Sequence, residues 1–239
     1  MTRPAGARVP ADLGRPAPPR SPAGPHERRL PGVLAGPQAR LGLGAAALVA
    51  TAGAVHRNRV GPWEAKIFRA VNGLPDSWYP PAWAVMQMGA LGAVPAAAAA
   101  AWLAGDGELA GRLLMAGAGT WGLAKLVKQV VRRPRPADLL PGIRGRGRDP
   151  TGLGYLSGHA GVAAALGAAA IPRFGPAGRG LILGAAAAVG LTRVYVGAHL
   201  PLDVAGGAAL GLVLDAAAGL VLASARHGSR PPGHRPGGT

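Results

Sequence analysis

The chain has 239 residues, no cysteine and a formal net charge of +16, and 49% of its residues are hydrophobic. This length allows one domain with tails, and the lack of cysteine excludes a disulfide scaffold, a zinc ribbon and a cysteine nucleophile. The charge indicates an anionic partner, but it does not choose among nucleic acid, anionic lipid and a phosphorylated substrate.

Both ends of the chain are predicted to be disordered tails. Residues 1–40 are rich in proline and arginine and have no sustained apolar period, so they cannot bury enough surface to offset the entropy cost of folding. Residues 227–239 form a second polar tail. The first apolar run begins near Leu41, later than in a secretory signal peptide, so we expect no cleavage. The folded domain is therefore predicted to span residues 41–226.

Six apolar segments lie between the tails, at 41–55, 82–104, 111–131, 158–174, 179–196 and 203–223. Charged residues crowd between these segments, as in a polytopic membrane protein. A soluble helical bundle is the alternative, but its helices would need polar stripes, and the second segment offers only Gln87. We predict an all-α fold, a polytopic membrane protein with a six-transmembrane-helix bundle, in which the first segment is short for a full crossing.

Three polar clusters lie at the ends of these segments. Residues 128–136 end the third segment, residues 156–159 begin the fourth, and residues 192–203 join the fifth to the sixth. Successive helices of a membrane bundle run in opposite directions. All three clusters are therefore expected at one membrane face.

The residue types in these clusters suit a phosphate group. Lysine and arginine give charge-assisted donors to phosphoryl oxygens. Ser157 is predicted to cap a helix whose first free N–H groups form an anion site. Asp203 follows His199 by four residues, so its carboxylate is expected to accept a hydrogen bond from one ring nitrogen and leave the other free for attack. With His159, these groups make a complete set for nucleophilic catalysis.

The three clusters resemble the signature motifs of the phosphatidic acid phosphatase type 2 superfamily, which covers membrane lipid phosphatases and vanadium-dependent haloperoxidases. The motifs K-x6-R-P, P-S-G-H and S-R-x5-H-x3-D match at residues 128–136, 156–159 and 192–203. Two positions depart from them: Leu156 replaces the proline of the second motif, and Thr192 replaces the first serine of the third.

The resemblance implies a role for each matched residue. His199 would be the nucleophile that forms a phosphohistidine, Asp203 its orienting carboxylate, and His159 the general acid that protonates the leaving oxygen. The phosphoryl oxygens would be held by Lys128, Arg135, Ser157, Gly158 and Arg193. Neither a metal nor another cofactor is implied.

We therefore predict an integral membrane phosphatase that acts on a lipid phosphate or diphosphate. Polyprenyl phosphates or diphosphates, phosphatidic acid and phosphatidylglycerol phosphate are the candidate substrates. A phosphotransferase with the same intermediate and a non-enzymatic lipid-phosphate binder or transporter are the alternatives. The membrane segments argue against the haloperoxidase branch, and the lack of a basic aromatic face argues against nucleic acid. The motifs specify no oligomeric state.

Lysine and arginine divide equally between the two predicted faces, so the positive-inside rule gives no orientation. The family's active site usually lies on the extracytoplasmic side of the membrane, and arginines precede the first segment. We expect a multi-pass plasma-membrane protein with cytoplasmic tails and an extracytoplasmic site.

Charged residues outside the motifs have their own expected roles. Lys125, Arg132 and Arg133 are expected either to assist the phosphate or to contact lipid headgroups. The arginines of 144–148 are expected in a solvated loop, with the steering of an anionic substrate as the alternative. Asp215, a carboxyl within an apolar segment, is expected to face the bundle in a structural role.

Overall fold

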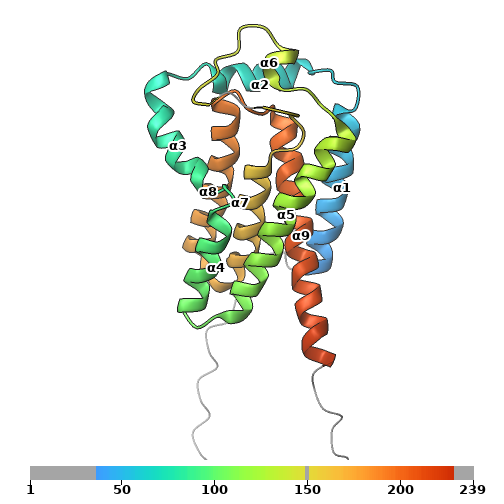
Figure 1. The fold of residues 1–239 in the computed structure, drawn as a ribbon, viewed down its shortest axis with the longest axis vertical. Helices are drawn as coiled ribbons and strands as arrows, with labels where there is room; N and C mark the ends of the chain where they lie inside the picture. Colours follow the sequence, from blue (N-terminus) through green and yellow to red (C-terminus); the bar gives the residue numbers. More distant parts are fainter. Residues whose placement is uncertain (1–35, 149–150, 229–239) are drawn as a thin grey trace, which may run out of the picture. The chain divides into compact units, whose positions relative to one another are not determined.

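All regular structure is helical in the part of the chain that the computed structural model describes, residues 36–148 and 151–228 (Figure 1). The helices are α1 (Pro37–Val55), α2 (Pro62–Asn72), α3 (Tyr79–Gln87), α4 (Ala93–Leu103), α5 (Gly107–Val131), α6 (Pro136–Leu139), α7 (Gly158–Ala170), α8 (Pro176–Tyr195) and α9 (Pro201–Gly228). Two 3₁₀ turns, η1 (Asp76–Trp78) and η2 (Ile171–Arg173), complete the order. The predicted all-α class is confirmed for these residues.

Local sequence explains where several helices begin. Proline is the first residue of α1, α2, α6, α8 and α9, a position where its missing N–H and fixed φ are well tolerated. Asp106 caps α5 by accepting a hydrogen bond from Leu109 N at 2.9 Å. α1 begins four residues before the predicted segment, and α9 continues to Gly228. The predicted tails otherwise lie outside the described residues.

The second apolar segment, residues 82–104, was expected to be one helix, and this prediction is wrong. α3 ends at Gln87 and α4 begins at Ala93. Gly89, in the turn between them, packs so closely on His159 that an added Cβ would collide with its carbonyl oxygen and with Val189. The chain bends where it meets α7 and α8, a tertiary contact that an alanine-rich run does not reveal.

α9 lies at the centre of the bundle and packs against α1, α5 and α7. Gly207 and Gly211 allow its backbone to approach α7, because a Cβ at either position would collide with a carbonyl oxygen, that of Ser157 or that of Gly161. This close approach holds the start of α7 against the start of α9.

Three of the described helices are long and apolar enough to cross a membrane: α1, α8 and residues 201–226 of α9. α1, whose segment was predicted to be short for a crossing, has 19 residues and is among them. The outer faces of these helices expose large apolar side chains, such as Leu181 (76% exposed) and Val49 (73% exposed). Apolar faces of this kind suit a lipid environment and are unusual in water.

α2 is amphipathic and lies across one end of the bundle, close to α6 (Figure 1). It buries Glu64, Phe68 and Asn72 against the bundle and exposes Trp63 and Ile67. α2 contacts α8 and α9, and the first and third polar clusters lie next to it.

Candidate active site

The three polar clusters come together at this end of the bundle. Ser157 N donates a hydrogen bond to the carbonyl of Asp203 at 2.8 Å, which joins the second cluster to the third. Arg135 Nη1 donates to the carbonyl of Ala198 at 2.7 Å, which joins the first cluster to the third. Residues that lie up to 75 positions apart in the sequence, from 128 to 203, therefore share one site.

His199 lies in the short loop between α8 and α9 and is 3% exposed. Arg135 Nη1 lies 3.2 Å from His199 Nε2. A guanidinium group can only donate, so Nε2 accepts and the ring proton is on Nδ1. Burial, together with the charges of Lys128 and Arg135, lowers the pKa of His199 to about 3, although Asp203 acts in the opposite direction. The ring is therefore neutral and carries a lone pair on Nε2.

Asp203, in the first turn of α9, is fully buried beside this ring. Its Oδ2 lies 3.8 Å from His199 Nδ1, so the expected hydrogen bond is not formed. Oδ2 instead accepts from Leu200 N at 2.8 Å, and Oδ1 accepts from Arg133 at 2.8 Å. Within the described residues, Nδ1 has no hydrogen-bond partner. Asp203 therefore acts on His199 through its charge.

The three cations predicted to hold phosphate donate to neutral atoms. Lys128 Nζ lies 2.9 Å from the carbonyl oxygen of Leu153, and Arg135 Nη2 lies 2.9 Å from that of Thr151. Arg193 Nη1 lies 3.0 Å from a methionine sulfur. None of the three is paired with a carboxylate within 4.0 Å in the described part of the chain. Their positive charges are therefore available to an anion.

The second cluster forms the start of α7. Ser157 Oγ accepts from Ala160 N at 3.4 Å, so the predicted N-cap is confirmed. Gly158 and His159 are the first two residues of this helix. His159 lies within electrostatic reach of Lys128 and Arg193. The start of α7 therefore lies near Lys128, a cation that also acts on His199.

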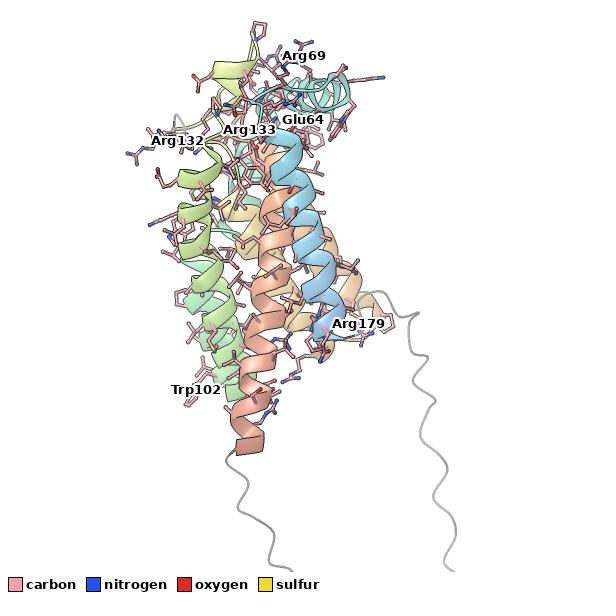
Figure 2. All side chains as sticks on the ribbon, turned by 90° about the vertical axis from the view of Figure 1, so that its right-hand side faces the viewer. Glu64, Arg69, Trp102, Arg132, Arg133 and Arg179 are labelled. Atoms are coloured by element: carbon pink, nitrogen blue, oxygen red, sulfur yellow. The ribbon has the colours of Figure 1, made fainter. Side chains whose placement is uncertain are left out.

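Arg133 was expected to contact phosphate or lipid headgroups, and this prediction is wrong. It is fully buried, and its guanidinium lies between Glu64 and Asp203. Figure 2 shows Glu64 and Arg133 close together at this end of the bundle. Burial by itself would lower the pKa of Arg133, but the two carboxylates raise it above its ordinary value. Arg133 therefore remains charged inside the protein.

Glu64 was not among the residues predicted to form the site. It is the one acidic residue between positions 41 and 75, in a stretch that otherwise carries Arg and Lys. An isolated acidic residue in a basic interhelical sequence was the signal that could have found it. Its carboxylate accepts two hydrogen bonds from Arg133 and one from Leu202 N at 3.0 Å.

Three other charged residues with an expected role are Arg146, in the loop after α6, and Lys125 and Arg132, near the end of α5. Arg146, expected to be solvated, instead lies 2.8 Å from Asp76, donates to the Tyr195 carbonyl and covers the Tyr195 ring. Its loop is thereby held against the end of α8. Lys125 lies over the Trp121 ring, whereas Arg132 is exposed.

Two apolar cavities flank α8. One, of about 610 Å³, is lined by α4, α5, α7 and α8, and the other, of about 280 Å³, by α7, α8 and α9. The larger cavity includes Met88 and Val189, which adjoin the contact between Gly89 and His159. It therefore begins close to the polar site and continues along the bundle.

Among the described residues, no cluster of three or more His, Asp or Glu side chains is suited to hold a metal ion.

Comparison with known proteins gives a match in family and in fold. The model of the PAP2 superfamily matches residues 109–224, which contain all three clusters. The crystal structure of Aquifex aeolicus LpxE is similar, with a TM-score of 0.59 and 21% identity, covering 64% of this chain and 92% of that one. So is the crystal structure of the first transmembrane PAP2 type phosphatidylglycerolphosphate phosphatase from Bacillus subtilis, with a TM-score of 0.59 and 20% identity, covering 80% of this chain and 98% of that one. No curated protein sequence matches. The resemblance that the motifs indicated is confirmed.

Proposed function

We propose that this chain, a membrane protein whose residues 109–224 belong to the PAP2 superfamily, is a phosphatase that removes a phosphate group from a lipid. One observation carries the proposal. Buried, neutral His199 presents Nε2 toward Arg135, and the negative charge of Asp203 lies beside Nδ1. The Nε2 lone pair can therefore attack phosphorus, with a cation next to it to bind the phosphate. A carboxylate on the other side of the ring can stabilise the positive charge that the ring then gains.

In the first step, His199 Nε2 attacks phosphorus. The phosphoryl group enters between Nε2 and Arg135, which gives up its contact with the ring and binds a phosphoryl oxygen. The bond between phosphorus and the lipid oxygen breaks, the electron pair leaves with that oxygen, and His159 supplies the proton. Lys128 and Arg193 neutralise the other phosphoryl oxygens, with the Ser157 hydroxyl and the Gly158 N–H as further donors. The product is a phosphohistidine and a lipid alcohol.

In the second step, water replaces the lipid. His159, now neutral, takes a proton from water, whose oxygen attacks phosphorus, and the bond to Nε2 breaks. Inorganic phosphate leaves and His199 is regenerated. With a lipid diphosphate the same two steps release the lipid monophosphate. With another hydroxyl in place of water, the enzyme is a transferase.

The large apolar cavity favours a lipid over a soluble phosphate ester. It begins near His159 and has space for part of an acyl or prenyl chain. The Bacillus subtilis protein of similar fold is named as a phosphatidylglycerolphosphate phosphatase, so this lipid is included in the substrate panel. Phosphatidic acid and polyprenyl phosphates and diphosphates complete it.

The proposed topology has six crossings of the plasma membrane, made by α1, α3 with α4, α5, α7, α8 and α9. The site is extracytoplasmic and both tails are cytoplasmic. Because the chain has no cysteine, Gly147→Cys and Ser229→Cys can each be labelled in intact cells with an impermeant thiol reagent. We expect Gly147→Cys to be labelled and Ser229→Cys to be protected. The reverse pattern would invert the topology.

The test of the function is phosphate release by the purified protein from each lipid in the panel, with excess EDTA present. We expect turnover in EDTA and inhibition by vanadate, whose trigonal-bipyramidal form resembles the transition state. Transfer of phosphate to an added hydroxyl acceptor would identify a transferase. Binding of lipid without turnover would identify a binder, and turnover restored only by Mg²⁺ would contradict the mechanism.

A further inference from the structure

Glu64 lies outside the three motifs, yet its carboxylate is fully buried next to the site. Its Oε1 and Oε2 accept from Arg133 Nη1 and Nη2 at 3.1 and 2.8 Å. Leu202 N, in the first turn of α9, is a third donor at 3.0 Å. α2 thus places a fixed negative charge against the helix that carries Asp203.

A single arginine nitrogen connects the two carboxylates. Arg133 Nη1 donates to Glu64 Oε1 and also to Asp203 Oδ1, at 2.8 Å from the latter. If Glu64 were absent, Arg133 and Asp203 would form a buried pair with no net charge. With Glu64 present, the three groups carry a net charge of −1.

The reaction needs this net charge. When Nε2 bonds to phosphorus, the imidazole ring of His199 becomes positive in a buried site that also holds Lys128 and Arg135. A buried positive charge is costly unless a negative charge compensates it. Asp203 provides that charge only if Arg133 does not cancel it.

We infer that Glu64 is a positioning residue of this active site: by neutralising Arg133, it leaves the charge of Asp203 to stabilise His199 as its ring becomes positive. The inference rests on the proposed function. Glu64 acts through Arg133 and Asp203 and does not bind the phosphate itself.

The first test is Glu64→Gln, which keeps the shape of the side chain and removes its charge. We expect kcat with phosphatidic acid to fall about 10- to 100-fold, as removal of one partly screened charge allows. KM should change by less than about threefold, because substrate contacts are intact. Glu64→Asp, which restores the charge, should recover most of kcat. The matched control is Glu108→Gln, which removes an exposed carboxylate that contacts Arg226 at 2.6 Å. It should leave kcat unchanged.

The second test adds Arg133→Gln to Glu64→Gln. The double variant again leaves Asp203 with a net charge of −1, so its kcat should exceed that of Glu64→Gln by about fivefold or more. An ion pair with a purely structural role predicts that the double variant is no better than the single one. That result, in protein shown to be folded by size-exclusion chromatography and thermal unfolding, would overturn the inference.

The possible outcomes separate this inference from the proposed function. Equal phosphate release by wild type and His199→Gln, or none by wild type, would overturn both. An active wild type with an equally active Glu64→Gln variant would overturn the inference alone. If Glu64→Gln does not fold, the double variant decides: a kcat within about tenfold of wild type supports the inference, and a greater loss contradicts it.

Discussion

α9 carries two buried carboxylates, Asp203 near its start and Asp215 near its middle, and each is paired with arginine. Asp215 accepts from Arg112 at 2.7 and 2.9 Å and lies 2.9 Å from Arg40. These arginines belong to α5 and α1, so Asp215 connects three helices. The expected structural role of Asp215 agrees with this arrangement.

The two clusters differ in charge and in what they adjoin. At Asp203, two carboxylates share Arg133 beside His199, whereas at Asp215 one carboxylate serves two arginines. The Asp203 end also holds cations without a carboxylate partner among the described residues. A buried ion pair is therefore not itself a sign of an active site. The surplus negative charge beside a neutral histidine is the difference that matters.

The largest expected effect is that of His199→Ala. Without Nε2 no phosphoenzyme forms, so turnover should fall on the order of 10⁵-fold or more with every substrate. Steady-state phosphate release measures this, with thermal unfolding as the control for folding. A variant that keeps a tenth of wild-type turnover would show that another residue is the nucleophile.

Exchanging each carboxylate for asparagine tests the comparison directly. Asp203→Asn should lower kcat roughly 10³- to 10⁴-fold, because the ring loses its compensating charge. Asp215→Asn should leave kcat per folded molecule near that of wild type and lower the free energy of unfolding by about 3 kcal/mol, because two arginines lose their partner. Activity and unfolding of both variants in detergent give the result. A large loss of kcat in folded Asp215→Asn would remove the distinction.

His159→Ala should have a smaller effect than His199→Ala, about 10²- to 10⁴-fold, the usual contribution of general acid catalysis. The loss should shrink with p-nitrophenyl phosphate, whose leaving group departs without protonation. The measurement is the loss of turnover in His159→Ala with a lipid phosphate, divided by its loss with p-nitrophenyl phosphate. Equal losses for good and poor leaving groups would show that His159 is not the acid.

Filling the larger apolar cavity along α8 should lower the catalytic efficiency toward a lipid substrate by about tenfold. Ala185 lines the larger cavity, and Ala185→Phe should lower kcat/KM for a long-chain lipid phosphate by about this factor while sparing p-nitrophenyl phosphate. The matched control is Leu181→Phe, on the exposed face of the same helix. Equal losses with both substrates would show that the cavity does not receive the lipid chain.

The smallest expected effect concerns pH. Burial holds the pKa of His199 near 3, so in the free enzyme the neutral ring persists from pH 8 down to pH 5 and gains its proton only in stronger acid. In ¹⁵N-histidine-labelled protein, the ring signals of His199, assigned by their absence in His199→Gln, should not move across this range. A titration near pH 6.5 would mean that the ring is less buried than the structure shows.

Local sequence predicted the parts of the fold and site that depend on neighbouring residues. The cap of α7 at Ser157 and the motif spacings require only a few adjacent positions. The sequence could not reveal the break at Gly89, because its cause is the backbone of His159, 70 residues later. It likewise could not reveal the sharing of Arg133 between Glu64 and Asp203, since nothing local to these residues indicates the contact.

The spacing of His199 and Asp203 was informative but incomplete. Four residues bring the two side chains to 3.8 Å, yet a hydrogen bond was expected. Leu200 N and Arg133 occupy the carboxylate oxygens instead. A pattern of spacing predicts proximity, whereas competition among donors decides which bond forms.

The most direct test of the central claim is to trap the phosphoenzyme. Wild-type protein is mixed with lipid labelled in its terminal phosphate, quenched within the first turnover under alkaline conditions and separated from free phosphate. We expect label bound to the wild-type protein, located on His199, and none in His199→Ala. His159→Ala should carry more label when its substrate has a good leaving group, because the slow step is then loss of the phosphate to water. Label that persists in His199→Ala would contradict the account.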